Sequence, residues 1–231
     1  MKKTLAKGLA LAVLGTAMMA GSAMAVPTLT LSDGVTTINV ADGSPLDSNP
    51  LAKVVTYNGA VGSNWLLNVT TGQGNYIPGF LDLNSVDNTL GGAGTLTINF
   101  QNKITGPTPT NDYTSQVGGT LAQNPNATLK NGASFDLKID GLSMSLLNFL
   151  NTDSTSPFTP MSFSGSDAFT HILGAGAHTI DMLVTISHKN VGATSFNWAV
   201  TTPVPEPATM LLLGSGLAGL AGIGRRRMKK V

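Results

Sequence analysis

The chain has 231 residues, of which 42% are hydrophobic and only 11% are charged, and it contains no cysteine. Disulfides, thiolate metal sites and cysteine nucleophiles are therefore excluded, so that burial of apolar surface must stabilise the fold. The formal net charge is +1, but eight of the thirteen cations lie in the first seven and the last seven residues. Residues 26–204 keep five cations against eleven acidic residues, a net charge of −6. We expect no nucleic-acid partner, because such binding needs clustered cations.

The first 25 residues have the pattern of a secretory signal peptide. Three lysines stand within the first seven residues, and an apolar run follows over residues 9–20. Ala23 and Ala25 supply the small residues of a signal peptidase site. We therefore predict a signal peptide over residues 1–25, with signal peptidase and the secretion machinery as partners. An uncleaved signal anchor is the alternative.

Residues 26–203 form one predicted domain in which hydrophobic residues alternate with a period of two. Such alternation between turn dipeptides such as Asp33-Gly34 and Gly91-Gly92 is typical of short antiparallel strands. The fold class predicted is all-β, an antiparallel β-sandwich of jelly-roll-like type. Strands are expected near Thr28–Leu31, Val35–Val40, Lys53–Tyr57, Trp65–Thr70, Gly94–Phe100, Ser134–Asp140, Ala168–Leu173, His178–Ser187 and Thr194–Val200.

Three segments of the domain break this alternation. Leu142–Leu150 carries leucines at positions 146, 147 and 150, which favours one or two helical turns. Thr105–Pro109 and Asn151–Pro160 are polar and contain prolines, so we expect long loops there.

The domain offers few residues for catalysis. His171, His178 and His188 show no metal-ligand spacing and are expected on the surface or on edge strands. No glutamate occurs between residues 26 and 204, and most aspartates stand singly at turns, which disfavours a glycosidase. Gly165-Ser166-Asp167 is interpreted as a loop rather than a catalytic serine turn. We therefore expect no enzyme activity, and a secreted hydrolase remains a less favoured alternative.

Two features could support ligand binding. Asp82, Asn84 and Asp87 offer several hard oxygen atoms within a short stretch, so they are calcium candidates, although ordinary turn residues give the same pattern. Exposed aromatic side chains could form a carbohydrate-stacking face, but Trp65 and Trp198 lie within strand patterns, where core packing is expected. The other aromatic candidates are Tyr57, Tyr76 and Tyr113.

The segment 204–231 has three parts that follow one another directly. Pro205, Glu206 and Pro207 form a short rigid element that a helix cannot continue through. Residues 208–224 are uncharged and at the short end of what spans a bilayer as a helix, roughly 17–25 residues. A basic tail follows, and its cations should remain in the cytoplasm as a membrane stop. These cations are Arg225, Arg226, Arg227, Lys229 and Lys230.

This order of rigid tripeptide, apolar helix and basic tail resembles the PEP-CTERM protein-sorting signal of Gram-negative bacteria. The resemblance covers only this tail, and a plain membrane anchor that is never cut is the alternative. It implies that an exosortase is a partner and cleaves at or near Pro205-Glu206-Pro207. It also implies a precursor in the inner membrane with its domain on the periplasmic side, and a processed form at the cell surface or outside the cell.

The sequence thus leads to one main hypothesis and two alternatives. The main hypothesis is an exported, non-enzymatic protein of the cell surface or of the extracellular biofilm matrix, with extracellular polysaccharide as a possible further partner. A lectin-like domain that binds carbohydrate or calcium is the first alternative. A secreted hydrolase is the second.

Overall fold

The computed structural model describes residues 26–76, 79–106, 111–123, 130–151 and 160–201. Within these ranges the chain forms strands and turns, with no helix. The strands are β1 Thr28–Ser32, β2 Thr37–Ala41, β3 Val54–Val61, β4 Trp65–Tyr76, β5 Gly79–Thr89, β6 Gly94–Gly106, β7 Asn111–Gln123, β8 Gly132–Ile139, β9 Leu142–Leu150, β10 Met161–His171, β11 Gly176–His188 and β12 Gly192–Thr201.

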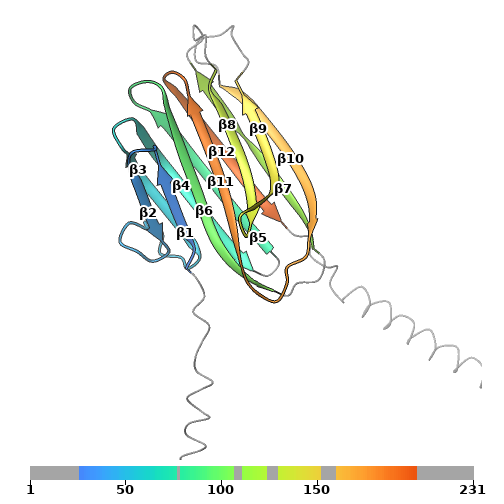
Figure 1. The fold of residues 1–231 in the computed structure, drawn as a ribbon. Helices are drawn as coiled ribbons and strands as arrows, with labels where there is room; N and C mark the ends of the chain where they lie inside the picture. Colours follow the sequence, from blue (N-terminus) through green and yellow to red (C-terminus); the bar gives the residue numbers. More distant parts are fainter. Residues whose placement is uncertain (1–25, 77–78, 107–110, 124–129, 152–159, 202–231) are drawn as a thin grey trace, which may run out of the picture.

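Two six-stranded sheets pack face to face as a sandwich (Figure 1). The first sheet has the order β2-β1-β6-β11-β8-β9, and the second has the order β10-β7-β12-β5-β4-β3. The pairings are antiparallel, as in β11 with β6 and β12 with β7. The predicted all-β antiparallel sandwich is confirmed, whereas the predicted signal peptide and C-terminal helix lie outside the described residues.

Period-two alternation aligns apolar side chains across each sheet. In the first sheet, one inward row crosses all six strands through directly opposed residues. Its members are Ile38, Leu31, Ile98, Val184, Phe135 and Leu147. Because neighbours in such a row lie opposite one another, each strand extends the same apolar surface toward the second sheet.

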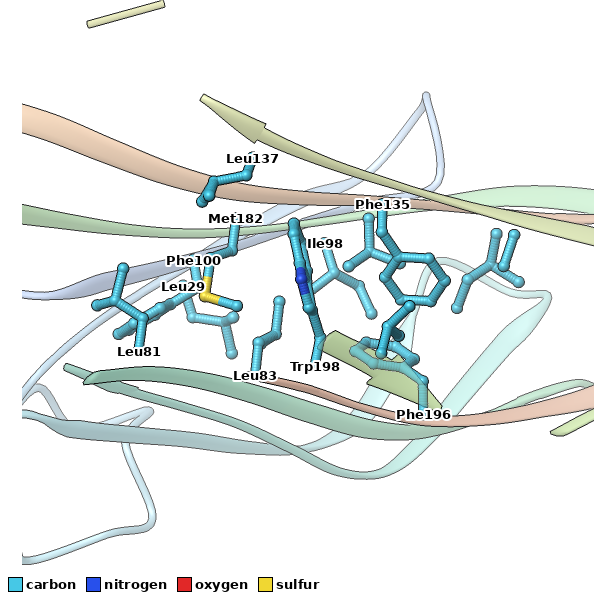
Figure 2. Close-up of a cluster of buried hydrophobic side chains, with 14 of the residues drawn as sticks. Leu29, Leu81, Leu83, Ile98, Phe100, Phe135, Leu137, Met182, Phe196 and Trp198 are labelled. Carbon is cyan, nitrogen blue, oxygen red and sulfur yellow. The ribbon is translucent and has the colours of Figure 1, made fainter. Parts of the chain in front are cut away.

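Aromatic rings and aliphatic side chains together fill the space between the two sheets (Figure 2). Phe135 of the first sheet lies edge-on to two rings of the second, with centroid distances of 5.2 Å to Phe196 and 5.5 Å to Trp198. Trp65 and Trp198 are fully buried, so the core position predicted for both tryptophans is confirmed.

Glycines on the inner face of the second sheet provide room for these rings. A Cβ atom added at Gly72 of β4 would stand 2.2 Å from the ring of Phe100. A Cβ atom at Gly165 of β10 would stand 2.9 Å from the ring of Phe149. The aromatic residues of the first sheet therefore pack directly onto the backbone of the second.

The prediction of helical turns over Leu142–Leu150 is wrong, because this segment is strand β9. It pairs with β8 in antiparallel register, with Leu147 opposite Phe135. Leu147 and Phe149 pack against the core cluster, and this tertiary contact overrides the local leucine spacing.

Other departures concern polar segments. Gly165-Ser166-Asp167, predicted as a loop, lies within β10 and pairs with β7. Strands β5 and β7 were not predicted, because asparagine, aspartate and glycine interrupt their apolar positions. β6 continues to Gly106, into the first predicted loop. Most of the two predicted loops, residues 107–109 and 152–159, lies outside the described residues.

Two adjacent glycines of β7 test how closely the backbone is packed within the second sheet. A Cβ atom at Gly119 would stand 2.1 Å from the carbonyl oxygen of Ser195, whereas at Gly118 its nearest contact would be 3.7 Å away. We expect Gly119→Ala to lower the free energy of unfolding by about 2 kcal/mol or more, since overpacking shifts the backbone. Gly118→Ala should change it by no more than about 0.5 kcal/mol. Denaturant unfolding of both variants measures the difference, and equal effects would contradict the packing argument.

Candidate functional site

The predicted sorting segment follows directly on a central strand of the sandwich. β12 lies between β7 and β5 and ends at Thr201, where it pairs with Thr114 and Phe80. The sorting tripeptide Pro205-Glu206-Pro207, the apolar run 208–224 and the basic residues lie outside the described residues. Ala23 and Ala25 lie outside them as well. The structure therefore places the end of β12 at Thr201, the last described residue before the tail.

Both described ends of the chain lie at the same end of the sandwich. Thr28 pairs with Gln101, toward the end of β6, and Thr201 pairs with Thr114, near the start of β7. β6 and β7 are consecutive strands joined at that end of the sandwich. In Figure 1 β1 starts at the lower side of the sandwich, and the arrowhead of β12 points toward the same side. The segments that precede and follow the domain thus start from one end of it.

The three calcium candidates do not converge. Asp82 and Asn84 lie on the outer face of β5, whereas Asp87 points into the sandwich and is fully buried. All three residues belong to β5, and this strand is hydrogen-bonded to β4 on one side and to β12 on the other. Among the residues that the structure describes, no group of three histidine, cysteine or acidic side chains could hold a metal ion.

Asp87 belongs to a buried chain of hydroxyl groups and a carboxyl group. Ser85 Oγ donates to Asp87 Oδ1 at 2.5 Å, and the Thr70 and Ser85 hydroxyls lie 2.7 Å apart. Asp87 Oδ2 has no hydrogen-bond partner in the described part of the chain. Burial raises the pKa of Asp87 to about 7, while the bond from Ser85 opposes this shift.

His188 occupies a neighbouring position in the same interior, so its predicted surface or edge location is wrong. Its ring is 1% exposed and lies 4.8 Å from the ring of Trp65. Nε2 lies 2.8 Å from Thr194 Oγ1, and Nδ1 lies 3.2 Å from Thr89 Oγ1. Thr194 stands opposite Asp87 in the β12–β5 register. Burial lowers the pKa of His188 to about 4, so the imidazole is neutral at pH 7.

These buried groups have the chemistry of an acid and a base but no access to a substrate. Asp87 and His188 are both sealed between the sheets. The hydroxyl groups around them pair with both ring nitrogens of His188 and with one carboxyl oxygen of Asp87, which would otherwise be unpaired inside the core. Sequence reasoning missed this cluster, since burial of Asp87 depends on β5, which alternation did not reveal.

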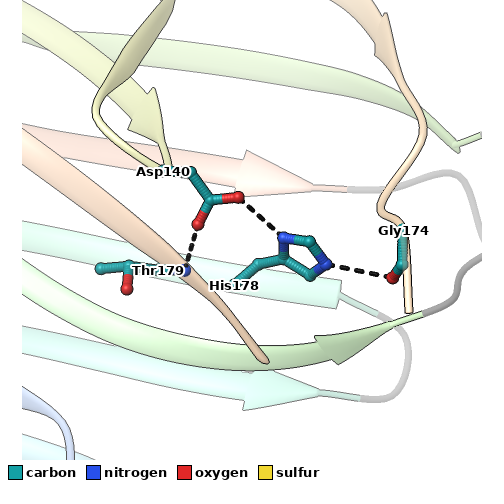
Figure 3. A network of polar contacts seen from close by, with 4 residues as sticks. All are labelled: Asp140, Gly174, His178 and Thr179. Carbon is teal, nitrogen blue, oxygen red and sulfur yellow. Dashed lines mark hydrogen bonds and ion pairs between the residues drawn. The ribbon is translucent and has the colours of Figure 1, made fainter. Parts of the chain in front are cut away.

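A second polar contact lies at one end of the first sheet (Figure 3). His178 Nδ1 lies 2.7 Å from Asp140 Oδ2, and His178 Nε2 lies 3.0 Å from the carbonyl oxygen of Gly174. Asp140 Oδ1 also accepts the Thr179 N–H at 2.9 Å. The hydrogen bond with His178 lowers the pKa of Asp140, and the same bond raises the pKa of His178.

This contact is held by a tight hairpin turn between β8 and β9. Asp140 and Gly141 both have positive φ, 50° and 81°, as expected of the two central residues of a type I′ turn. The Asp140-Gly141 dipeptide is the sequence pattern from which this hairpin could have been predicted. The contact joins the hairpin to the β10–β11 connection, so it fixes two turns of the sandwich to each other. His171, the third histidine, ends β10 and is half-buried.

The outer face of the second sheet has a shallow groove of about 330 Å³ over the glycine pair of β7. Gly118 has no side chain there, and the groove is bordered by Asn84, Val86, Ser195 and Asn197. The amide and hydroxyl groups are neutral hydrogen-bonding groups of the kind that sugars contact. Phe196 is the one aromatic residue in its lining, and its side chain is buried in the core. Of the aromatic candidates, Tyr113 is buried and stacks on Phe169, Tyr57 is half-buried, and the Tyr76 side chain lies outside the described set.

The raised pKa of Asp87 predicts an unusual pH dependence of stability. The folded-state pKa of about 7 exceeds the ordinary 3.8, so this group favours folding at low pH and loses that effect as pH rises toward 7. Between pH 5 and pH 8 it should lower the stability of the protein by about 2–3 kcal/mol. Asp87→Asn removes this contribution, so its stability relative to the parent should be higher at pH 8 than at pH 5.

Thermal or denaturant unfolding at the two pH values measures this change. Asp112→Asn is the matched control, because it removes one negative charge from an exposed position of β7. His188 contributes equally to parent and variant, and it acts in the opposite direction below about pH 6.5. A difference between Asp87→Asn and the parent that is the same at both pH values would show that Asp87 does not titrate in this range.

Comparison with known proteins identifies one family feature. The family model described as the PEP-CTERM protein-sorting motif matches residues 203–227. No curated protein matches the chain. Within the ranges that the structure describes, there is no helix with the length and apolarity that a membrane crossing requires.

Solved structures show only weak likeness to the sandwich. A cycloisomaltooligosaccharide glucanotransferase from Paenibacillus sp. is 21% identical with a TM-score of 0.24, covering 68% of this chain and 17% of that one. The carbohydrate-binding module TmCBM61, in complex with β-1,4-galactotriose, is 7% identical with a TM-score of 0.29, covering 61% and 89%. A family 35 carbohydrate binding module from Clostridium thermocellum is 12% identical with a TM-score of 0.23, covering 64% and 90%.

At these TM-scores the solved structures support no statement about function. The chain also spans only 17% of the glucanotransferase. The sorting motif begins two residues after the last residue of β12, so the matched segment and the sandwich adjoin without a further domain between them. The motif implies export, a C-terminal membrane anchor before processing, and an exosortase as processing partner. The chain is therefore a β-sandwich protein that carries a PEP-CTERM protein-sorting motif.

Proposed function

We propose that this protein is an exported, non-enzymatic component of the cell surface or of the extracellular polysaccharide matrix. The sorting motif at residues 203–227 is the observation that carries the proposal. In this view residues 1–25 direct export and are removed after Ala25. The sandwich then serves as the exported unit, and its outer faces and edges make the contacts of the mature protein.

The sequence of the tail supports a transient membrane anchor. Residues 208–224 are uncharged, and five cations follow within seven residues. An apolar helix of this length crosses a bilayer, and the cations hold its end in the cytoplasm. Pro205, Glu206 and Pro207 would then stand at the periplasmic surface, where an exosortase cleaves at or near them.

The position of β12 supports the same arrangement. Only residues 202–207 separate Thr201 from the apolar run. Fully extended, these residues and their flanking bonds span at most about 25 Å. The end of the sandwich that holds both chain ends would therefore face the membrane, and the opposite end would point away from it.

Two observations support a non-enzymatic role. The acid and base side chains with the strongest pKa shifts, Asp87 and His188, are buried between the sheets and out of reach of a substrate. The contact between Asp140 and His178 joins two turns and has no nucleophilic side chain in its hydrogen-bond set.

A lectin-like role is the second candidate, and the groove over Gly118 favours it. Asn84, Ser195 and Asn197 present amide and hydroxyl groups around this groove on the outer face of the second sheet. Such groups can bind the hydroxyls of a polysaccharide without a metal ion. Binding of exopolysaccharide from the host that is lost in Asn84→Ala/Asn197→Ala, but retained in Asn39→Ala on β2 of the other sheet, would support this role.

Processing gives the direct test of the main proposal. Replacement of Pro205, Glu206 and Pro207 by alanine should leave the tail uncut and the protein in the membrane fraction, since the cleavage element is lost. Mass spectrometry of the C-terminal peptide, in host cells that contain an exosortase, measures this outcome.

Thr202→Ala is the matched control, because it changes a residue close to the tripeptide but outside the matched segment 203–227. This variant should be processed like the parent protein. A parent protein that retains Val231 in exosortase-containing cells would contradict processing. Recovery of the chain in the cytoplasm with residues 1–25 intact would contradict export.

A further inference from the structure

Strand β9 forms an unpaired edge of the first sheet. It is the last strand in the order β2-β1-β6-β11-β8-β9, and β8 is its one strand partner in the described structure. In an antiparallel ladder alternate residues bond to one side, so the remaining N–H and C=O groups of β9 point away from β8. An edge of this kind can pair with a strand of another chain.

The sequence of β9 lacks the features that usually block such pairing. Its nine residues, LSMSLLNFL, contain no charged residue, no proline and no glycine. Leu146 and Leu150 are 55% and 62% exposed, although leucine is usually buried. Uncharged, apolar strands without proline are the segments that associate most readily through their edges.

The other three edge strands are each protected. β2 has only five residues, and β3 has a bulge between Tyr57 and Gly59 that interrupts its ladder. β10 carries the charged Asp167 at its centre. Short length, bulges and charges are the known means by which edges avoid association. The pairing of β9 with β8 also has an irregularity between Ser143 and Ser145, but Ser145–Leu150 pair without interruption. β9 is thus the one described edge strand that carries exposed large hydrophobic residues.

β9 is also held rigidly in place. The ring of Phe149 lies 4.5 Å from that of Phe163 in β10 and 5.9 Å from that of Phe135 in β8. Inward packing of Phe149 and Leu147 fixes the pleat of the strand, so Leu146, Asn148 and Leu150 share the opposite, outer face. Since the backbone is already extended and ordered, pairing costs little further conformational entropy.

We propose that two copies of this chain associate through antiparallel pairing of their β9 strands, which joins two six-stranded sheets into one. The proposal rests on the proposed exported role, in which the copies are concentrated at one surface. A two-fold axis at Asn148 would place Leu146 of each copy opposite Leu150 of the other. Pairing would cover these exposed leucines and satisfy the outward backbone groups. The neighbouring charges, Lys138 and Asp136 of β8, already form an ion pair at 3.3 Å.

Cysteine cross-linking tests this pairing in the full chain, because the native sequence contains no cysteine. Single variants Leu146→Cys, Asn148→Cys and Leu150→Cys are produced in host membranes and exposed to a mild oxidant. Asn197→Cys, an exposed asparagine on the outer face of central strand β12, is the matched control. We expect about tenfold more disulfide-linked dimer from Asn148→Cys than from this control, because pairing raises the local concentration of the two thiols.

Charge substitutions then separate specific pairing from random collision. In the Asn148→Cys background, Leu146→Lys with Leu150→Lys should reduce the dimer to the control level, because like charges would meet across the new ladder. Leu90→Lys, at an exposed leucine after β5, should leave the dimer unchanged. If no β9 cysteine exceeds the Asn197→Cys control, the pairing is overturned.

Mass spectrometry of the same samples distinguishes this proposal from the sorting proposal. A cross-linked dimer that retains Val231 would support pairing and contradict processing. A processed chain that stays monomeric at all three β9 positions would contradict pairing alone.

Discussion

Packing of aromatic rings from one sheet against bare backbone in the other is the interaction on which this structure depends. Phe100 lies against Gly72, and Phe149 lies against Gly165. The chain has no cysteine and few charges, so neither disulfides nor ion-pair networks can hold the sheets together. Large rings seated on glycine bring the sheets close, and they bury more apolar area than aliphatic side chains would.

This core leaves little room for chemistry inside the sandwich. Asp87 and His188 within it are bonded to neighbouring hydroxyls and have pKa values shifted toward their neutral forms. They are therefore part of the packing. The features that can act on other molecules lie at the periphery: the segment after β12, the groove over Gly118 and the edge at β9.

Strands with clear alternation were predictable, because the polarity of each residue indicates which face of the sheet it occupies. β6, β8 and β11 show this, with Leu96, Phe135 and Val184 on the inner face as expected. β5 was not predictable, because a buried Asp87 and Ser85 interrupt its apolar positions. Their burial depends on hydroxyl partners from β4, and local sequence carries no information about such partners. The prediction for β9 failed for a related reason, since adjacent leucines at 146 and 147 face opposite sides of the sheet.

Alternation, turn dipeptides and the order of the tail are local patterns, and they are enough to predict the fold class and the sorting motif. Tertiary structure alone decided which polar residues are buried, which turns are joined by Asp140 and His178, and which strand is left at an unprotected edge. These properties depend on the strand order, in which β8 and β9 follow β11 rather than β7 in space. Strand order is set by long-range packing between the two sheets, and no short segment of the sequence specifies it.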